Sequence, residues 1–214
     1  MKNVFLLPEI AEKYDAYYQT DPGKTIDNLE KDVLKKLMTE VPRGHMLEPG
    51  CGTGHWTAFF EELGFSVTAL DNSEAMLAYT SGKNIDAKFL KGDAQNLPFE
   101  DESFTVIASV TMLEFVDDQD KAINEMHRVL EPGGWLILGC LNATSVLGQN
   151  KEKDPVFKNA HFLTKEMLRK KLGNFSIIKI KENVHLSTNF EILDGKPAAK
   201  DHEPAFLAVL AQKP

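Results

Sequence analysis

The sequence predicts an α/β fold, a doubly wound and mostly parallel sheet with helices on both faces. Short apolar runs alternate with helical patterns from about residue 45 to residue 140, and the first run ends in a glycine-rich loop at 50–54. The chain starts with helical patterns and ends with two further β-rich runs. Alternating β and α units imply a parallel sheet, because the crossover between parallel strands packs a helix against the sheet.

A chain of 214 residues with 43% hydrophobic and 26% charged residues is expected to form a single globular domain. Two helices are predicted at its start, over 10–18 and 25–39, with a break at 21–23 where Asp-Pro-Gly interrupts the pattern. The second helix carries apolar residues at helical spacing. They are Ile26, Leu29, Val33, Leu34 and Leu37.

Strands and helices then alternate along the chain, each recognised by its apolar period and its flanking turn residues. The predicted strands are 45–48, 66–70, 87–90, 104–109, 135–139, 174–181 and 204–211. The further predicted helices are 56–63, 73–79, 118–130 and 164–172, the last two capped by Asp117 or Asp118 and by Thr164. The segments 142–161 and 183–203 are predicted as long connections, a kind that is often functional or disordered.

The loop after the first strand has the composition of a nucleotide-binding turn. Glu48 ends the strand, and glycine then occupies every second position from 50 to 54 before a helix begins. Glycine tolerates positive φ and lets backbone approach a ligand, and a strand, a glycine loop and a helix N-terminus together form a nucleotide-type site. The dinucleotide fingerprint Gly-x-Gly-x-x-Gly is not met, because its last glycine would fall on His55 or Thr57.

Carboxylates follow at the ends of the second and third predicted strands. Ligands of open parallel sheets lie outside the carboxyl ends of the strands, so Asp71 could accept hydrogen bonds from both hydroxyls of a ribose. Asp71 also fits the start of the next helix with Ser73 as N-cap, and both roles are compatible. The third strand ends in Gly92-Asp93, which taken alone is an ordinary turn.

Three segments together resemble the class I S-adenosylmethionine (SAM)-dependent methyltransferases. The glycine loop is similar to that family's Glu-x-Gly-x-Gly-x-Gly pattern, 92–99 to its Gly-Asp-Ala-x-x-Leu-Pro-Phe signature, and 130–134 to its Leu-x-Pro-Gly-Gly hallmark. The resemblance is closest to the broad methyltransferase type 11 group, which includes quinone-biosynthesis C-methyltransferases. It is tight over about residues 40 to 140, although Pro49 replaces a more usual branched residue.

The resemblance implies the complete architecture. It predicts a seven-stranded sheet in the order 3-2-1-4-5-7-6 with the last strand antiparallel. Within the single domain 1–214 it implies an N-terminal helical lid at 1–40, a SAM-binding half at 41–140, and an acceptor-side half with a closing hairpin at 141–214. The implied cofactor is SAM, and the implied product is S-adenosyl-L-homocysteine.

The resemblance also implies residues that contact SAM. Glu48 would meet the ammonium group directly or through water, Asp93 would take the adenine amine, and the backbone N–H of Ala94 would meet a ring nitrogen. Met76 would pack on the adenine, or it would be plain core, the commoner role of a helical methionine. The full predicted set is Tyr14, Tyr18, Glu48, Gly50, Cys51, Gly52, Gly54, His55, Asp71, Asn72, Met76, Asp93, Ala94, Ser109 and Val110.

Residues 14–18 are similar to the aromatic segment with which the family covers its cofactor and substrate. A tyrosine ring excludes water and its hydroxyl can bind a carboxylate, so Tyr14 and Tyr18 are the expected contacts. The alternative is an amphipathic helix whose aromatic face packs on the core.

The chemistry leaves the catalytic residues open. Transfer from a sulfonium needs alignment and exclusion of water, and a base only if the nucleophile keeps its proton. Glu114, just beyond the fourth strand, and His161, near the expected acceptor mouth, are the candidates for a base or substrate contact. His55 would touch ligand or simply begin its helix, and His127 is predicted to be structural. The Asn-Pro-Pro-Tyr motif used for amide or base nitrogens is absent after the fourth strand.

The composition limits the kinds of partner that the protein is expected to bind. The formal net charge of −8 argues against a large nucleic-acid footprint, DNA included, and the basic cluster at 165–171 fits a solvated helix face. Cys51 and Cys140 fit neither a disulfide framework nor a zinc site, and no metal is predicted. No apolar run is long enough to span a bilayer and the N-terminus lacks a cleavage pattern, so no membrane association and a cytoplasmic location are expected.

The leading hypothesis is a SAM-dependent methyltransferase that acts on a small molecule, as a monomer or homodimer. A methyltransferase acting on protein or RNA would need a basic, aromatic surface beside 110–116. A non-catalytic SAM-binding module would keep the same binding residues. An NAD-dependent oxidoreductase is disfavoured by the glycine spacing, and the fold alone does not choose among these functions.

Overall fold

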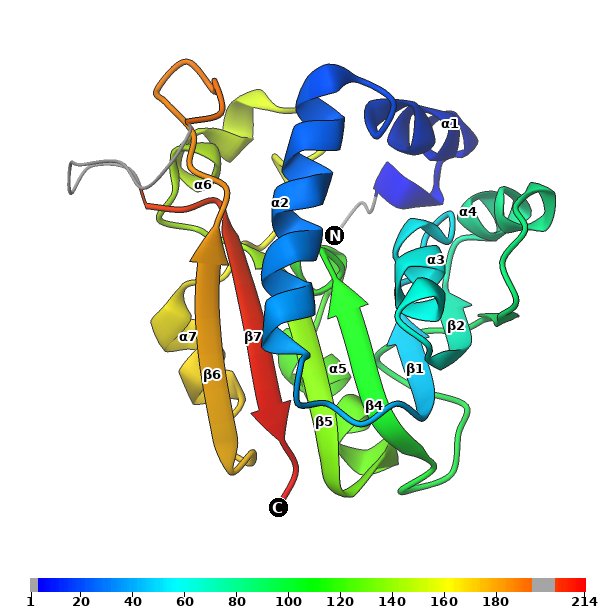
Figure 1. Cartoon of the computed structure of the whole chain (residues 1–214). Helices are drawn as coiled ribbons and strands as arrows, with labels where there is room; N and C mark the ends of the chain where they lie inside the picture. The colour runs from blue at the N-terminus through cyan, green and yellow to red at the C-terminus, as the bar shows by residue number, and fades with distance from the viewer. Residues whose placement is uncertain (1–3, 194–202) are drawn as a thin grey trace.

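The computed structural model describes residues 4–193 and 203–214, and within these ranges seven strands form one sheet, as the sequence predicts. The strands lie in the order β3-β2-β1-β4-β5-β7-β6 (Figure 1). Their bounds are β1 (His45–Pro49), β2 (Ser66–Asp71), β3 (Lys88–Lys91), β4 (Phe104–Val110), β5 (Leu130–Leu141), β6 (Ile177–Asn183) and β7 (Phe206–Gln212).

The sheet reverses its winding direction at β1. The pairs β1–β2, β2–β3, β1–β4 and β4–β5 are parallel, so β2 and β4 flank β1 on opposite sides. The last strand, β7, runs antiparallel to both β5 and β6, as predicted. Open α/β sheets bind their ligands outside the carboxyl ends of the strands, at the point where the winding reverses. The topology therefore predicts a ligand site at the loop that follows Pro49.

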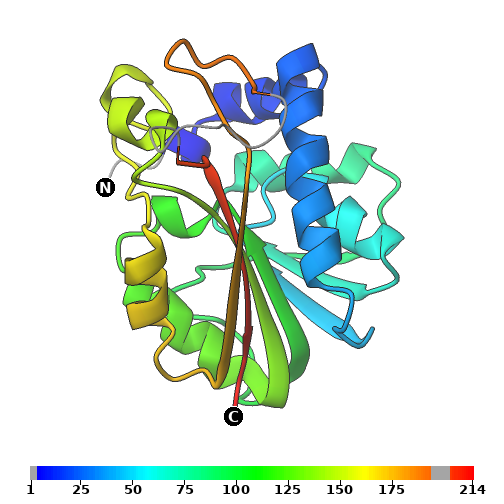
Figure 2. The same ribbon diagram turned by 60° about the vertical axis from the view of Figure 1, so that its left-hand side comes forward.

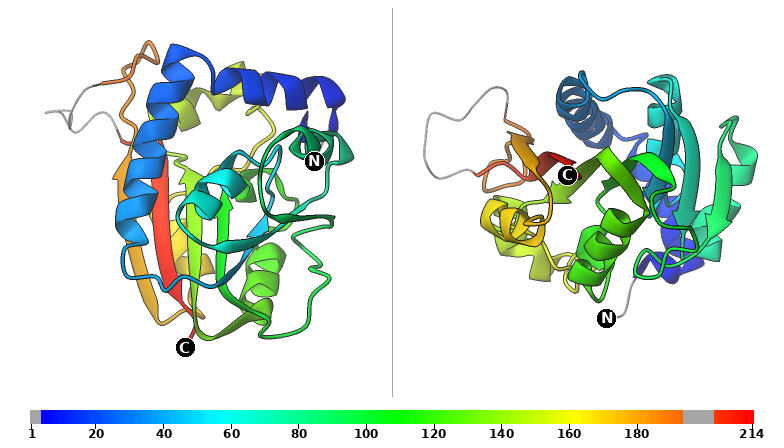
Figure 3. Two further views of the ribbon diagram at one scale, coloured as in Figure 1. Left: turned by 45° about the vertical axis from the view of Figure 1, so that its right-hand side comes forward. Right: turned by 90° about the horizontal axis from the view of Figure 1, so that it is seen from below.

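Helices cover both faces of the sheet, and one crosses its upper edge. Figures 1 and 3 show α2 and α3 on one face and α5 and α7 on the other, and Figure 2 shows α1 above the edge where the parallel strands end. The helices are α1 (Pro8–Tyr17), α2 (Asp21–Leu37), α3 (His55–Glu62), α4 (Glu74–Ala78), α5 (Gln119–Val129), α6 (Val146–Asn150) and α7 (Lys165–Lys171). The 3-10 turns are η1 (Val4–Leu6), η2 (Thr80–Gly82), η3 (Leu113–Phe115) and η4 (Lys151–Lys153).

Side-chain caps begin several helices where the sequence predicts them. The side-chain oxygens of Ser73, Asp118 and Thr164 accept hydrogen bonds from backbone N–H groups three residues later. Each cap satisfies one of the donors that a helix start leaves unpaired.

Several boundaries differ from the prediction by a few residues, the start of the sixth strand at Ile177 rather than 174 among them, and two of the differences have a local physical reason. Residues 21–23 were expected to break the chain between helices, but they form the first turn of α2, with Thr20 as its N-cap. Proline fits a first helical turn because the missing N–H has no partner there anyway. The fifth strand begins at Leu130 rather than 135, because Leu130 pairs with Phe104 ahead of an irregularity at the Pro-Gly-Gly turn.

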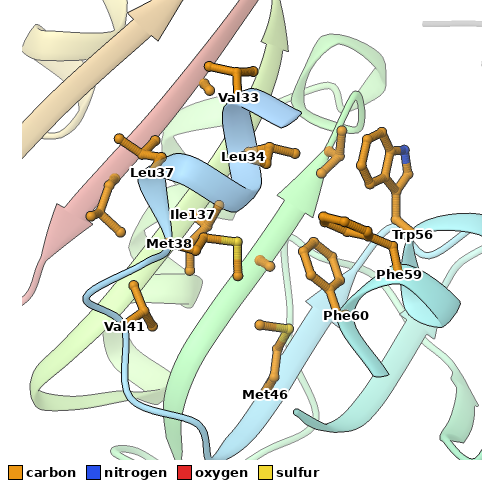
Figure 4. Close-up of a cluster of buried hydrophobic side chains, with 14 of the residues drawn as sticks. Val33, Leu34, Leu37, Met38, Val41, Met46, Trp56, Phe59, Phe60 and Ile137 are labelled. Carbon is orange, nitrogen blue, oxygen red and sulfur yellow. The ribbon is translucent and has the colours of Figure 1, made fainter. Parts of the chain in front are cut away.

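The apolar face of α2 anchors the N-terminal part of the chain to the sheet. Figure 4 shows Val33, Leu34 and Leu37 directed from α2 toward the strands. Leu34 has no exposed surface. On the opposite face, α5 and α7 bury a second set of side chains that includes Ile123 and Met126. Because helices bury both faces of the sheet, the sequences of its central strands are continuous apolar runs.

The two predicted long connections contain local structure. Residues 142–161 include the short helix α6, capped by Ser145. In 183–203, Leu186 pairs with Ile192 in an isolated bridge, and residues 194–202 lie outside the described part of the chain. Among the residues that the structure describes, none of the helices combines the length and the apolar character that a membrane crossing requires.

Replacement of Leu34 by alanine should leave a cavity between α2 and the sheet. We expect the free energy of unfolding to fall by about 2–5 kcal/mol, the usual cost of truncating a fully buried leucine. Urea denaturation followed by circular dichroism measures this loss. The matched control is Lys35→Ala on the exposed side of the same helix, which should change stability by less than about 0.5 kcal/mol. Equal effects of the two variants would contradict the packing described for α2.

Candidate functional site

The loop between β1 and α3 has a backbone conformation that glycine adopts readily and other residues rarely adopt. Gly50 has φ of +77°, and a Cβ placed there would lie 2.1 Å from Cγ of Met112. Residues with a side chain rarely tolerate this φ, and the close approach excludes even a methyl group. The glycine at position 50 thus allows the loop to pack against the segment that follows β4.

A cavity opens at this point, where the ends of β1, β2, β3 and β4 meet. It comprises about 630 Å³ of space not occupied by protein, including its open side. The predicted cofactor residues that line it are Tyr14, Gly50, Gly52, Asp71, Asn72, Met76, Asp93, Ala94 and Val110. Thr111, which was expected with Ser109 and Val110 to pass beneath the sulfur end of SAM, also lines it. The lining residues for which no contact was predicted are Phe5, Leu70, Gly92, Met112, Phe115 and Val116.

Asp71 connects three elements at the edge of the cavity. Its Oδ2 accepts a hydrogen bond of 2.8 Å from the backbone N–H of Gly52, and its Oδ1 accepts one of 2.8 Å from the backbone N–H of Ser73. Burial raises the pKa of this carboxyl above its ordinary value, although these backbone donors oppose the shift. The side chain therefore fixes the glycine loop while it borders the cavity.

The two predicted adenine-side residues differ in exposure. Ala94 is buried, whereas Asp93 is exposed and its carboxylate accepts hydrogen bonds from the backbone and side chain of Gln95. Met76 is buried on α4 and borders the cavity. An apolar floor and a polar rim are thus present at the end of β3.

Glu48 lies beneath the loop rather than on the cavity wall. It is 1% exposed, and its Oε2 accepts a 2.6 Å hydrogen bond from the hydroxyl of Thr57. Burial raises the pKa of Glu48 to about 8 despite this hydrogen bond, so the carboxyl is mainly protonated at neutral pH. Any contact between Glu48 and a ligand stays a prediction.

Tyr18 and His55 pack on each other away from the cavity wall. Their rings stack with centroids 3.6 Å apart and planes 10° apart. Nε2 of His55 lies 2.7 Å from Oδ1 of Asp27 on α2, and the hydroxyl of Tyr18 donates a 3.0 Å hydrogen bond to the hydroxyl of Tyr14. The pair therefore supports Tyr14, which does line the cavity.

The remaining predicted cofactor contacts, Cys51, Gly54 and Ser109, lie in the glycine loop or against it. Cys51 is buried, and Gly54 is the N-cap of α3. The hydroxyl of Ser109 donates a 2.7 Å hydrogen bond to the carbonyl of Pro49, joining the ends of β4 and β1. None of these three is among the described residues that line the cavity.

An ion-pair cluster that the sequence did not indicate ties α1 to the glycine loop. The hydroxyl of Thr53 donates a 2.5 Å hydrogen bond to Oδ1 of Asp15, and Nζ of Lys83 lies 2.7 Å from Oδ2 of Asp15. Lys83 also donates a 2.7 Å hydrogen bond to the carbonyl of Thr53. Close contacts between residues 30 to 68 positions apart leave no sequence signal, since no short period or motif relates them.

The two candidate catalytic residues have different surroundings. Glu114 has no exposed surface, and its Oε1 accepts a 2.5 Å hydrogen bond from the backbone N–H of Leu141. Burial raises the pKa of Glu114 to about 7. His161 is exposed, and its backbone N–H donates a 2.7 Å hydrogen bond to the carbonyl of Glu114. His127 lies on α5 with its ring edge-on to Phe175, and it is not among the described residues that line the cavity.

No group of three or more histidine, cysteine, aspartate or glutamate side chains in the described ranges has an arrangement that could hold a metal ion. The cavity instead combines backbone donors, isolated carboxylates and apolar side chains. Such a combination suits an organic ligand with a few polar groups.

The geometry agrees with comparisons to known proteins. A family model described as a methyltransferase domain matches residues 47–138. An uncharacterized protein of Methanocaldococcus jannaschii is 30% identical, over 99% of this chain and 99% of that protein. The malonyl-[acyl-carrier protein] O-methyltransferase of Pectobacterium atrosepticum is 35% identical over 53% of this chain, and the match spans 46% of that enzyme, about half its length.

A solved structure extends the similarity over the whole chain. It is a SAM-dependent methyltransferase of Thermotoga maritima, described as a possible histamine N-methyltransferase, with 28% identity and a TM-score of 0.78. The superposition covers 98% of each chain. The site and the fold define a Rossmann-like class I SAM-dependent methyltransferase. The chain belongs to the methyltransferase domain family, in the type 11 group that the sequence resembles.

The buried carboxyl of Glu48 should make stability depend on pH. Its pKa is raised in the folded protein, so its contribution to stability is fully present below the ordinary glutamate pKa of about 4.3 and is lost as pH rises through about 8. We expect Glu48→Gln to gain about 1–3 kcal/mol in unfolding free energy relative to wild type between pH 5 and pH 8. Urea denaturation at the two pH values measures the gain.

The control for this measurement is Glu62→Gln at an exposed position of α3. Its stability difference from wild type should be the same at both pH values. A Glu48→Gln variant that also tracks wild type at both values would contradict a protonated, buried Glu48.

Proposed function

We propose that the cavity binds SAM and that the protein transfers the methyl group of SAM to a small-molecule acceptor. The observation that carries the proposal is the meeting of three strand ends in one cavity, with Gly52 after β1, Asp71 at the end of β2 and Ala94 after β3. The sequence predicts that each of these three residues contacts a different part of SAM. Their common location in a member of this family supports a single ligand that touches all three.

The residues present fit the parts of SAM. Asp71 keeps unused lone pairs on two carboxylate oxygens, which suits a ribose with two hydroxyls. Met76, Ala94 and Val116 offer apolar surface on which an adenine ring can pack. The glycine loop and Tyr14 also line the cavity, and they would hold the methionine part.

When bound, SAM supplies a methyl group made electrophilic by its sulfonium. The contribution of the chain is to align an acceptor and to keep water out. Phe5 sits edge-on to both Tyr14 and Phe115, with ring centroids 5.9 Å and 4.6 Å apart. These three rings close the side of the cavity near Thr111 and would exclude water there.

A small-molecule acceptor is favoured by the charge of the chain and by the site. A net charge of −8 is unfavourable for binding RNA over a large surface. The names of the relatives cover acceptors as different as a malonyl group on a carrier protein and histamine, so they do not select one. Action on a macromolecule and SAM binding without turnover are the alternatives that an acceptor screen separates.

Replacement of Asp71 tests the cofactor site. We expect Asp71→Ala to weaken SAM binding by about 1–3 kcal/mol, roughly 5- to 150-fold in Kd, because ribose hydroxyls and the Gly52 N–H lose their acceptor. Calorimetric titration with SAM, S-adenosylhomocysteine and NADH measures the affinities. The wild type should bind the first two and give no heat with NADH. Asp86→Ala, an exposed aspartate before β3, is the matched control. An unchanged Kd in Asp71→Ala would overturn the proposed site.

Replacement of Asp15 tests whether α1 covers the cofactor. The variant Asp15→Ala breaks the contacts of α1 to Thr53 and Lys83, so we expect the Kd for SAM to rise about fivefold, on the order of 1 kcal/mol for a partly exposed charged pair. Glu12→Ala, at an exposed position of the same helix, should bind SAM as the wild type does. Removal of residues 1–20 should leave a folded core with impaired turnover, and normal turnover of that truncated chain would contradict a lid role.

A further inference from the structure

Tyr14 is in contact with the glycine loop and with the aromatic wall of the cavity. A Cβ placed on Gly52 would lie 3.9 Å from Cε1 of Tyr14, so the end of the ring that carries the hydroxyl lies next to the loop backbone. The ring of Phe5 meets that of Tyr14 edge-on, with centroids 5.9 Å apart. Tyr14, Gly52 and Phe5 all line the cavity. Contacts outside its own helix therefore contribute to the position of the Tyr14 hydroxyl.

A second tyrosine, Tyr18, bonds to the Tyr14 hydroxyl. Tyr18 donates a 3.0 Å hydrogen bond to it, and the two rings meet at 80° with centroids 5.2 Å apart. Burial raises the pKa of both hydroxyls, so each keeps its proton at neutral pH. A tyrosine hydroxyl has a single proton. Because the Tyr14 oxygen accepts the bond from Tyr18, the proton of Tyr14 remains available for an acceptor atom in the cavity.

His55 fixes the orientation of the Tyr18 ring. The imidazole stacks on that ring with centroids 3.6 Å apart and planes 10° apart. The ring of Trp56 also meets the imidazole, edge-on, with centroids 5.7 Å apart. His55 is the first residue of α3, directly after the glycine loop. Tyr18 cannot turn away from Tyr14 without losing the stack on a ring that the loop itself places.

Asp27 on α2 holds His55 in this orientation. Nε2 of His55 lies 2.7 Å from Oδ1 of Asp27, and Nζ of Lys31 lies 2.8 Å from Oδ2. Burial alone would raise the pKa of Asp27, but the hydrogen bonds from His55 and Lys31 lower it below its ordinary value, so the carboxylate is ionised. The side chains of Asp27 and His55 are only 13% and 18% exposed. A hydrogen bond to a largely buried carboxylate is stronger than one at the surface.

We propose that Asp27, His55 and Tyr18 form a positioning chain for the cofactor. The chain directs the Tyr14 hydroxyl toward the carboxylate in the methionine part of SAM. The inference rests on the proposed function and adds residues that act on the cofactor without touching it. None of the three is among the described residues that line the cavity, so they act through Tyr14. A bond donated to a carboxylate is charge-assisted, and the bond accepted from Tyr18 polarises the Tyr14 hydroxyl and strengthens it.

The test compares two ligands that differ only in the methionine part. S-adenosylhomocysteine carries the amino acid part on its sulfur, and 5′-methylthioadenosine carries a methyl group in its place. Calorimetric titration gives the Kd of each ligand and needs no methyl acceptor. The variants are Tyr14→Phe, Tyr18→Phe and His55→Phe, each of which keeps an aromatic ring and removes a polar group.

We expect Tyr14→Phe to raise the Kd for S-adenosylhomocysteine roughly tenfold or more, because it removes a hydrogen bond to a charged group. Tyr18→Phe and His55→Phe should each raise it about three- to tenfold, since the Tyr14 hydroxyl stays but loses its orientation. The Kd for 5′-methylthioadenosine should stay within about twofold, because this ligand offers Tyr14 no carboxylate. Tyr17→Phe, at an exposed position of α1, is the matched control and should bind both ligands as the wild type does.

Double variants separate positioning from a general effect on packing. If Tyr18 and His55 act through the Tyr14 hydroxyl, adding either substitution to Tyr14→Phe should change the Kd for S-adenosylhomocysteine by less than about twofold. Additive effects would overturn the positioning chain, and so would equal losses of affinity for the two ligands. Circular dichroism checks the fold of each variant. Tyr18→Phe decides the test if His55→Phe does not fold, and the double variants decide it if 5′-methylthioadenosine binds too weakly to measure.

The outcomes also separate this inference from the proposed function. A wild type that binds neither ligand removes the proposed function and the positioning chain with it. A wild type that binds S-adenosylhomocysteine, with Tyr18→Phe indistinguishable from it, overturns the positioning chain and leaves the proposed cofactor site in place.

Discussion

The pair of hydrogen bonds accepted by Asp71 is the interaction on which the site depends. One carboxylate oxygen holds the loop after β1 through Gly52, and the other holds the start of α4 through Ser73. Because β1 and β2 are parallel neighbours, both contacts form at one edge of the sheet. The glycine loop would otherwise have many accessible backbone states. The carboxylate selects one of them, and that state leaves a cavity between the strand ends.

Buried acids are the second constraint on this protein. Glu30, Glu48 and Glu114 lie at the same end of the molecule, and burial raises the pKa of each. Such groups lower stability at neutral and higher pH, because unfolding releases their protons. Apolar side chains are buried on both faces of the sheet around them.

The N-terminal helices connect these two features. Asp15 on α1 accepts a hydrogen bond from Thr53 of the glycine loop, and α2 carries the buried Glu30. The same segment thus contacts the glycine loop and supplies one of the buried acids. Closure of α1 over the loop would bring both ligands out of contact with water, the condition that methyl transfer from a sulfonium requires.

The sequence by itself determined the alternation of strands and helices and the residues at the strand ends, because apolar periods and glycine spacing are local patterns that it displays directly. The strand order followed from the family resemblance that its motifs carry. Tertiary structure alone decided which side chains share the cavity. It turned His55 toward Asp27, placed Glu48 under the loop beside Thr57, and joined Asp15 to Thr53. These relations join residues far apart in the chain, and they depend on how α2 packs across the sheet, which no local pattern records.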